Sequence, residues 1–441
     1  MRRFSHAVAA FAAVAAVAAL TGCVGGAGAT PDDPLLPADV VQLYGTDGNM
    51  LNSVGDLLVD HPEGIVGMKG TTPLSRLSQN FKDRLRSVYP DLNDESYAGE
   101  TYDAVVISAL AAQIARSTDP KEIAAQINGV TTSGTPCDAP VSCLNLVAAG
   151  TDIAYKGISL GLGGFTDAGE PSASTYGILR FADSNHLDAR QTQYVPAGDP
   201  ARATTQAPPA PARAAGSGPL RIGALLPKTG DLASAGPPMF AGALLAIKEI
   251  NDAGGVLGRP VGWIDGDDGT DPEVAKTTVQ SLINQGAHVI IGAGASSITL
   301  AVLPQILAAG VILFSPCNTA ATLSTVDDQG LYFRTAPPDN LQAAALTDVI
   351  MRDGVRRIVI VARDDAYGRG LMEAVKENLV RAGLADGDIN LKPYSPDEPD
   401  FGNLGEEIKQ FAPNGVLIIG FDETAKAVDS MIKAGLKSRT V

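Results

Sequence analysis

The 441-residue chain has few of the side chains that carry metal or nucleophilic chemistry. It contains four histidines, four cysteines and one tryptophan. The histidines show no paired spacing of the kind that binds a metal ion; they are His6, His61, His186 and His288. A metalloenzyme is therefore not indicated, and we expect neither a metal nor a cofactor.

Basic residues are also in short supply. The chain holds 33 Lys and Arg against 49 Asp and Glu, which gives a formal net charge of −16. Because this charge would repel a phosphate backbone, we expect no nucleic-acid partner. With 45% hydrophobic residues and 48 glycines, the composition is that of a folded α/β protein rather than of a disordered chain.

Long hydrophobic runs are missing, and the N-terminal leader is itself short. Two arginines precede the apolar run Ala7–Ala19, which is shorter than the ~20 residues needed to span a bilayer. The next segment, Leu20–Cys23 (LTGC), matches a lipoprotein cleavage box. We expect a signal peptide over residues 1–22, an acylated Cys23 and a tether over residues 23–37, so that the mature chain is anchored outside the cytoplasmic membrane. An ordinary cleaved signal peptide is the alternative.

Two further cysteines lie close together in the sequence. Cys137 and Cys143 flank the short loop CDAPVSC. Outside the membrane, where thiols are oxidised, we expect them to form a disulfide. A zinc site is a poor alternative because no histidine or additional cysteine lies nearby. Cys317 is then left as a free thiol.

From residue 218 onward, apolar runs alternate with helical patterns. The expected strands are Leu220–Pro227, Val261–Asp265, His288–Gly292, Val311–Ser315, Arg357–Ala362 and Val416–Phe421. The expected helices are Phe240–Ala253, Pro272–Gln285, Ile298–Ala308, Asn340–Arg352, Gly368–Ala382, Leu404–Phe411 and Glu423–Ala434. Strands separated by helices of about 10 to 15 residues favour βαβ units with parallel sheets.

The N-terminal half continues the same pattern. The expected strands are Val40–Tyr44, Glu63–Met68, Ser174–Arg180 and Gln191–Val195. The expected helices are Leu51–Val59, Leu74–Val88, Thr101–Ser117 and Pro120–Asn128. Residues 197–217 are rich in Pro, Ala and Gly and have no apolar periodicity, which is typical of a linker.

Eight short segments carry a combined family signature. They are Ile222–Gly230, Ala246–Leu257, Asp267–Ala275, Ile291–Ser297, Ser315–Thr319, Tyr332–Thr335, Asp365–Leu371 and Tyr102–Ala104. Together they resemble type I periplasmic solute-binding proteins of the branched-chain amino acid (Leu/Ile/Val) class. The resemblance implies an α/β fold of two Rossmann-like lobes with parallel sheets, joined by a hinge. The order is rotated, because residues 218–441 resemble the family's front half and residues 38–196 its back half.

A circular permutation would explain this rotated order. We expect lobe 1 to comprise residues 68–167 with 218–339, and lobe 2 to comprise residues 38–67 with 168–196 and 340–441. The linker would join the family's old C-terminus to its old N-terminus, and the Val40–Tyr44 strand should share a sheet with Val416–Phe421. A fusion of two incomplete halves and an exchange of segments between two chains are the alternatives.

The loop before one expected helix is suited to an anion. Ala295, Ser296 and Ser297 follow a strand and open the helix Ile298–Ala308, so its free N–H groups and dipole favour a carboxylate. By resemblance, Ser296 binds the ligand carboxylate; the alternative is that Ser296 or Ser297 only caps the helix.

A second loop also follows a strand, and the resemblance implies that it binds the ligand. The carbonyl of Cys317 would accept from an ammonium group, and Thr319 would add a hydroxyl. A turn built on Ser-Pro-Cys-Asn is the alternative.

Four more residues enter through the resemblance. Asp47 matches a carboxylate that pairs with the ligand ammonium, although an acid beside glycine is often only a turn former. Tyr367 matches a tyrosine that closes on the ligand, and Phe421 lies within one residue of another ligand-touching aromatic position; packing alone is the alternative for both. Ala235 stands where the family often has an aromatic residue, which leaves room for a bulkier or aromatic ligand.

The resemblance implies a lipid-anchored extracytoplasmic substrate-binding protein of an ABC importer. It would bind an amino acid or related small carboxylate between the lobes and deliver it to a permease. A sensory receptor not coupled to transport, and a binder of an aromatic carboxylate, are the alternatives. Gly157–Gly161 (GISLG) spells a nucleophile elbow, but the glycine-rich run after it does not begin a helix, so we expect no enzyme.

Overall fold

The structure, a computed structural model, describes residues 37, 39–209, 218–397 and 401–440. The expected signal peptide, the expected lipidation site Cys23 and the expected tether up to residue 36 lie outside the described residues. The chain from Pro37 onward forms one compact unit. Within the described ranges, none of the helices has the length and apolar character that a membrane crossing requires.

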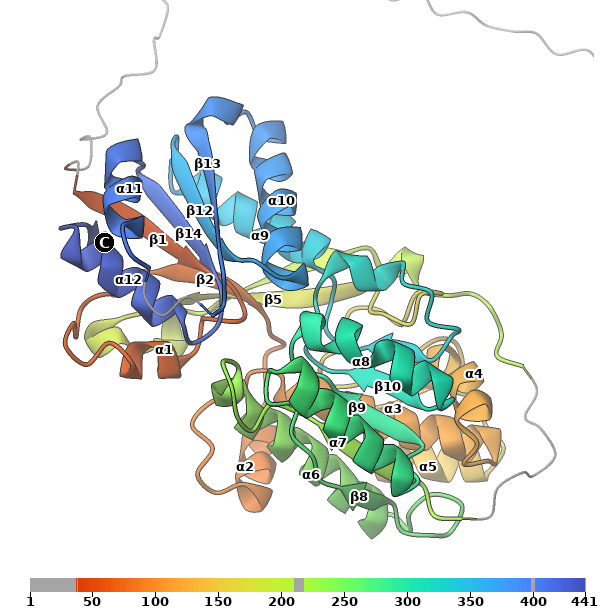
Figure 1. The fold of residues 1–441 in the computed structure, drawn as a ribbon. Coiled ribbons are helices and arrows are strands. Elements are labelled where there is room, and N and C mark those ends of the chain that lie inside the picture. The colour runs from red at the N-terminus through yellow and green to blue at the C-terminus, as the bar shows by residue number, and fades with distance from the viewer. Residues whose placement is uncertain (1–36, 38, 210–217, 398–400, 441) are drawn as a thin grey trace, which may run out of the picture. The chain divides into compact units, whose positions relative to one another are not determined.

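Two main sheets organise this unit (Figure 1). The smaller sheet is parallel throughout and has the order β11 (Tyr332–Arg334), β10 (Ile312–Ser315), β9 (Val289–Gly292), β7 (Arg221–Leu225) and β8 (Gly262–Ile264). The larger sheet has the order β13 (Ile389–Tyr394), β12 (Ile358–Arg363), β14 (Gly415–Ile419), β1 (Val40–Gly45), β2 (Lys69–Pro73), β5 (Ala173–Arg180) and β6 (Gln193–Gly198), with β15 (Lys437–Ser438) also paired to β1.

Helices pack against each sheet, and we call each sheet with its helices a lobe. The first lobe contains the five-stranded sheet with α2 (Gln79–Val88), α3 (Ala98–Ala115), α4 (Pro120–Val130), α5 (Pro140–Ala148), α6 (Gly236–Asp252), α7 (Pro272–Asn284) and α8 (Ser296–Ala308). The second lobe contains the eight-stranded sheet with α1 (Asn52–Asp56), α9 (Asp339–Arg352), α10 (Ala366–Arg381), α11 (Leu404–Phe411) and α12 (Thr424–Lys433).

Segments from both ends of the sequence meet in the larger sheet. Strand β1 pairs with β14 in parallel, with Gln42 opposite Gly415 and Tyr44 opposite Leu417. The short β15 pairs with the start of β1, and the Lys437 amide donates to the Asp39 carbonyl at 2.8 Å. The expectation that the first and last predicted strands share a sheet is therefore confirmed.

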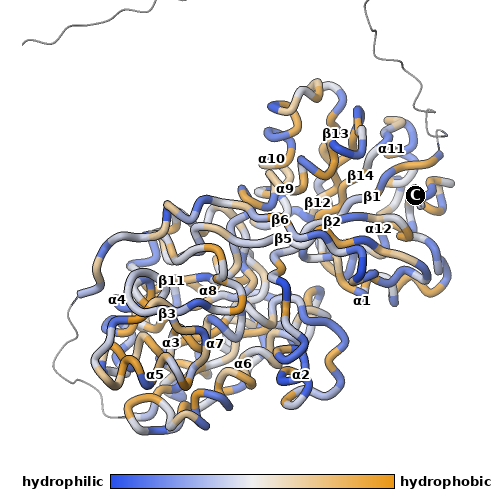
Figure 2. Tube along the Cα trace, turned by 180° about the vertical axis from the view of Figure 1, so that it is seen from behind, coloured by the Kyte–Doolittle hydropathy of each residue, from blue (hydrophilic) through white to orange (hydrophobic). Residues whose placement is uncertain are grey.

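Burial explains why these strands read as continuous apolar runs. Strands β9, β10, β12 and β14 are buried at every position, as expected for parallel strands with both faces covered. Figure 2 shows hydrophobic residues around β12 and β14 of the larger sheet, whereas α2 is largely hydrophilic. Helix α2 buries only Phe81 and Leu85, so it covers an edge of the core with one face.

The segment after α1 differs from its prediction. The prediction of a strand over Glu63–Met68 is wrong, because turns occupy most of this stretch. Its apolar residues Ile65 and Met68 are nevertheless buried in the core. The strand instead begins at Lys69, and it belongs to the eight-stranded sheet. The next helix starts at Gln79 rather than Leu74, because Ser78 caps it by accepting from the Phe81 amide.

Other elements escaped the sequence patterns. The larger sheet is mixed, since β5 runs antiparallel to both β2 and β6. A small two-stranded sheet of β3 (Thr135–Cys137) and β4 (Ile153–Tyr155) was not foreseen, and neither were α5, β11 and β13. Strand β6 runs to Gly198, so it includes the first two residues of the expected linker.

Candidate functional site

One pocket collects residues from both lobes. It is lined by Asp47, Gly48, Tyr97, Leu232, Ala235, Gly294, Ala295, Ser296, Cys317, Thr319, Tyr367 and Phe421. All of the expected ligand-binding residues except Ser297 are in this set, and Ser297 is the next residue after Ser296 in α8. The lobes thus bring together positions that lie up to 374 residues apart in the chain, counted from residue 47 to residue 421.

Asp47 is held at the pocket by a tight loop after β1. Asn49 accepts from the Thr46 amide at 2.8 Å, and its own amide group donates to the Ile418 carbonyl of β14 at 2.8 Å. The loop is therefore fastened to the neighbouring strand of its own sheet. This arrangement projects Asp47 beyond the carboxyl end of β1, where open α/β sheets place their crevices.

The carboxylate of Asp47 is buried among hydrogen-bond donors. Tyr97 Oη donates to Oδ2 at 2.7 Å, while Gln342 Nε2 and Tyr367 Oη each lie 2.8 Å from Oδ1. Burial raises the pKa of Asp47, and these three donors oppose that rise because they favour the charged form. Of the described residues that line the pocket, none is Lys, Arg or His.

The opposite wall of the pocket is the start of α8. The residue before the helix is Ala295, which has no side-chain cap, and Ser296 is the first helical residue. The alternative reading of Ser296 or Ser297 as the cap is therefore wrong. The first N–H groups of a helix have no partner within that helix, so this terminus presents donors and a positive dipole to the pocket.

A buried polar network shapes the loops around Ser296. Ser296 Oγ accepts from the Ala320 amide at 3.2 Å. Asn318 donates to the carbonyls of Ala293 and Gly294, at 3.0 and 2.9 Å. The loop after β10, which carries Cys317 and Thr319, is thereby tied to the loop after β9.

Asp268 supports the same wall from behind. Its Oδ2 accepts from the Gly294 amide at 2.8 Å and its Oδ1 from the Thr270 amide at 2.8 Å. Burial raises the pKa of Asp268 to about 6, against the effect of those two donors. Asp268 belongs to the Asp267–Ala275 signature segment. Its hydrogen bond to the Gly294 amide holds the Gly294 loop in position.

Cys317 and Thr319 line the pocket. Cys317 is a buried free thiol, and burial raises its pKa well above the usual range. Thr319 is also buried, and its carbonyl accepts from the Asp339 amide at 2.7 Å. That bond connects the first lobe to the start of α9 in the second lobe.

Two aromatic rings form the second-lobe side of the pocket. Tyr367 and Phe421 stack with centroids 5.7 Å apart and planes 16° apart. Gly48 allows this arrangement, because a Cβ there would lie 2.6 Å from the Gly420 carbonyl oxygen and 2.7 Å from the Phe421 ring. Ala235 and Leu232 line the other side, and both are buried.

Two residues near Asp47 were missed by the sequence analysis. Tyr97 precedes α3 in the first lobe with a left-handed backbone, φ 60° and ψ 4°, and nothing in its local sequence marks that conformation. Gln342 lies one turn into α9, where it also donates to the Thr71 carbonyl at 3.0 Å. Long-range contact alone brings both residues to Asp47.

Two other features of the sequence lie away from the pocket. Cys137, at the end of β3, and Cys143, in α5, form a disulfide. In the Gly157–Gly161 segment, Ser159 Oγ donates to the buried carboxylate of Asp103 at 2.6 Å, and the Ile158 and Ser159 amides donate to it as well. Ser159 therefore has a structural hydrogen bond to an acid of α3.

Comparison with known proteins places the C-terminal half in a family. The model of the periplasmic binding protein family matches residues 219–441. The Leu/Ile/Val-binding protein homolog 3 of Brucella melitensis is 26% identical over 203 residues, covering 46% of this chain and 54% of that relative. A leucine-, isoleucine-, valine-, threonine- and alanine-binding protein of Pseudomonas aeruginosa is 29% identical over 222 residues, covering 50% and 59%.

Solved structures give the same kind of partial match. The branched-chain amino acid transporter substrate-binding protein LivJ of Streptococcus pneumoniae, in complex with isoleucine, has 21% identity and a TM-score of 0.43, covering 50% of this chain and 63% of that one. The leucine-binding protein LivK of Thermotoga maritima has 22% identity and a TM-score of 0.41, covering 45% and 55%. The chain thus spans less than two thirds of the length of each of these proteins.

Proposed function

Because the chain belongs to the periplasmic binding protein family, we propose that it is a lipid-anchored extracytoplasmic substrate-binding protein of an ABC importer. It binds an amino acid or a related small carboxylate in the pocket between its lobes. The family consists of solute-binding proteins and not of enzymes. The observation that carries the proposal is the meeting of Asp47 and Ser296, from different lobes, in one pocket without a basic side chain among its described lining residues.

The two ends of the pocket suit opposite charges. Asp47 is a buried carboxylate, and the described residues that line its pocket offer it no cation, so a ligand ammonium would supply the missing charge. The amides at the start of α8, with the hydroxyls of Ser296 and Thr319, suit a carboxylate. A small zwitterion satisfies both ends at once, and a simple carboxylate satisfies only one.

The ligand's side chain would meet apolar surface. Leu232, Ala235 and Phe421 lie on the pocket wall and are buried. The curated relatives are named for leucine, isoleucine and valine. Because Ala235 is small and Phe421 belongs to a stacked pair, an aromatic side chain is the second candidate, and an aromatic carboxylate without an ammonium is the third.

A circularly permuted order supports the same function. The family match covers residues 219–441, whereas β1, β2 and β5 come from residues 40–180 and extend the sheet of β12 and β14. The N-terminal half thus supplies strands that the C-terminal half lacks. The lipid anchor on Cys23 and the permease partner follow from the leader and the family, and both belong to the proposal.

A ligand screen tests the proposal. Thermal unfolding and calorimetric titration of the purified protein should be measured against the common amino acids and a panel of aromatic carboxylates. We expect saturable binding of at least one amino acid, with a rise in melting temperature that grows with its concentration. If no compound of either panel binds, the proposal is overturned. If only carboxylates without an amino group bind, the ligand has no ammonium group to pair with Asp47. Uptake of the ligand by cells lacking the gene would then separate transport from sensing.

A further inference from the structure

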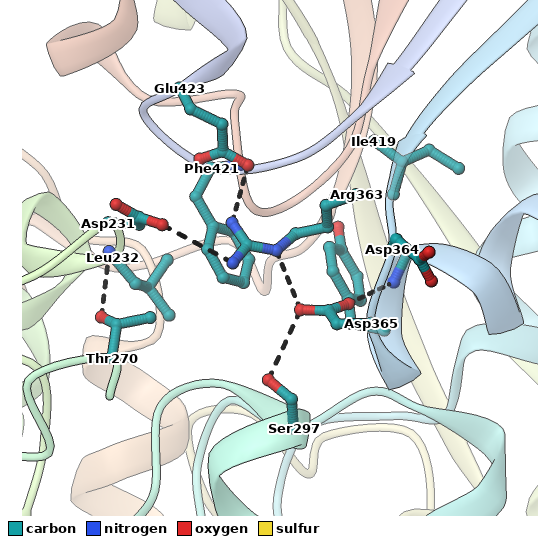
Figure 3. Close-up of polar contacts among 12 residues, drawn as sticks. Asp231, Leu232, Thr270, Ser297, Arg363, Asp364, Asp365, Ile419, Phe421 and Glu423 are labelled. Atoms are coloured by element: carbon teal, nitrogen blue, oxygen red, sulfur yellow. Dashed lines mark hydrogen bonds and ion pairs between the residues drawn. The ribbon is translucent and has the colours of Figure 1, made fainter. Parts of the chain in front are cut away.

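Arg363, at the rim of the pocket, faces three carboxylates. It is the last residue of β12, and only 5% of its side chain is exposed. Its Nη1 donates to Glu423 at 2.6 Å and its Nε to Asp365 at 2.8 Å, both within the second lobe. Its Nη2 lies 3.7 Å from Oδ2 of Asp231, which belongs to the loop after β7 in the first lobe (Figure 3). Only this third contact joins the lobes.

Further contacts cross between the lobes at the same rim. Ser297 of α8 donates to Asp365 at 3.4 Å, so the partner of Arg363 is itself in contact with the first lobe (Figure 3). The Asp422 amide donates to the Asp231 carbonyl at 3.3 Å, and Ser234 donates to the Asp422 carboxylate at 2.9 Å. These hydrogen bonds depend on the lobes being together, because each joins residues of different lobes.

Arg363 also contacts the wall of the pocket. Its guanidinium carbon lies 3.9 Å from the centroid of the Phe421 ring, within the range of a cation–π interaction. Phe421 in turn stacks on Tyr367, whose hydroxyl reaches Asp47. Neither Arg363 nor Asp231 lines the pocket itself. The arginine therefore links the rim contact to the pocket wall without occupying the ligand's place.

We propose that Arg363 and Asp231 form a latch between the lobes that sets how long the closed pocket retains its ligand. This inference rests on the proposed function, since it concerns the release of that ligand. The charges favour a latch that opens easily. The guanidinium already has a buried partner in Glu423 and a partly buried partner in Asp365, so the third carboxylate adds a weaker attraction. The Asp231 side chain is 47% exposed, and salt therefore screens its interaction with Arg363.

Substitution of Asp231 tests the latch without disturbing the buried arginine. Asp231→Asn keeps the shape and removes the charge, and we expect it to raise the ligand dissociation rate about two- to fivefold, as for an exposed ion pair. Asp231→Lys places a like charge beside Arg363 and should raise the rate further. In the parent protein the rate should increase with added salt, and this dependence should be weaker in Asp231→Asn. Stopped-flow displacement of the amino acid found by the screen measures these rates.

Asp364→Asn is the matched control. Asp364 is 43% exposed and pairs with Arg369 inside the second lobe, so its loss should leave the dissociation rate unchanged. A second measurement, hydrogen–deuterium exchange of residues 293–299, needs no ligand. Exchange of these residues should be faster in Asp231→Lys, because the lobes separate more often. If both Asp231 variants match the parent in dissociation and in exchange, the latch is refuted. If the screen finds no ligand but exchange responds as expected, the proposed function fails and the effect on ligand retention fails with it, whereas the contact between Arg363 and Asp231 is still shown to hold the lobes together.

Discussion

Tyr97 Oη donates a 2.7 Å hydrogen bond to Oδ2 of Asp47, and this bond crosses from the first lobe to the second. Both residues are buried, at 2% and 5% exposure. The acid is thus held between its own lobe, through Gln342 and Tyr367, and the opposite lobe, through Tyr97. Under the proposed function, ligand recognition and lobe closure would share this one carboxylate.

Replacing the acid should separate a zwitterionic ligand from a simple carboxylate. For an amino acid, Asp47→Ala removes the partner of the ammonium, and losing one member of a desolvated charge pair costs about 2 to 5 kcal/mol, which is roughly 30-fold to several-thousand-fold in Kd. Ser296→Ala should cost about 1 to 2 kcal/mol, because the amides of α8 remain. Calorimetric titration measures both. Parent-like affinity of Asp47→Ala would show that no ammonium is bound there.

The hydrogen bond between the lobes can be removed by deleting one oxygen atom, the hydroxyl of Tyr97. Tyr97→Phe leaves Asp47 with one donor fewer, and an unsatisfied buried acceptor costs about 1 to 3 kcal/mol. We therefore expect weaker ligand binding together with a lower free energy of unfolding. Tyr102→Phe is the control, since Tyr102 donates to Glu249 at 2.6 Å within the first lobe. It should lower stability and leave Kd unchanged. If both substitutions change Kd equally, the hydrogen bond from Tyr97 to Asp47 has no specific role in ligand binding.

Gly48 offers a steric test of the aromatic wall. In Gly48→Ala the new methyl group meets the Gly420 carbonyl and the Phe421 ring, so the loop or the ring must move. Overpacking of this kind typically costs about 1 to 3 kcal/mol, and we expect affinity to fall along with stability. Gly161→Ala is the control, because a Cβ at Gly161 meets no atom within 4 Å. Unchanged ligand affinity in Gly48→Ala would mean that the ligand does not depend on the position of Phe421.

Stability should fall between weakly acidic and weakly basic pH. Burial raises the pKa of Glu100 to about 8 and that of Asp268 to about 6, well above their unfolded values. The folded protein therefore keeps protons that the unfolded chain releases, so the free energy of unfolding decreases as pH rises from about 4 to 8. Urea unfolding at pH 5 and pH 8 should show this loss. Glu100→Gln should reduce the difference in the free energy of unfolding between pH 5 and pH 8. A parent protein that is equally stable at the two pH values would contradict this prediction.

Restoring the family's order of segments tests the permutation. A chain of residues 218–441 followed by residues 38–198 keeps every strand pairing of the larger sheet. The two parts need a Gly/Ser linker of about eight residues, because Lys437 and Ser438 lie beside β1 rather than before it. We expect a folded monomer that binds the same ligand with similar affinity, measured by calorimetry. A rearranged chain that does not fold would argue that the present order is required.

Much of the fold was predictable because the C-terminal half is built from buried parallel strands and capped helices. Helix α11 was predicted with its observed bounds, and β9, β10 and α7 within one residue. The segment before β2 was predicted wrongly as a strand, because its apolar residues are buried without pairing to a neighbouring strand. Strand β11 has only three residues, too few to show a period.

The candidate site was predictable where residues follow strands within a recognisable segment. Asp47, Ser296 and Tyr367 are of this kind, and the pocket brings them together. Tyr97 and Gln342 could not be found this way, since each reaches Asp47 only through the packing of distant elements. Sequence patterns describe neighbours along the chain, whereas these contacts span 50 and 295 residues.

The pairing of β1 with β15 also decides which lobe holds the two ends of the described chain. Asp39 and Thr440, near the two ends of the described chain, both lie at the second lobe. A segment joined to the chain through Asp39 is therefore joined to the lobe that carries Asp47 and Arg363, whereas Ser296 and Asp231 belong to the lobe that holds neither end of the described chain.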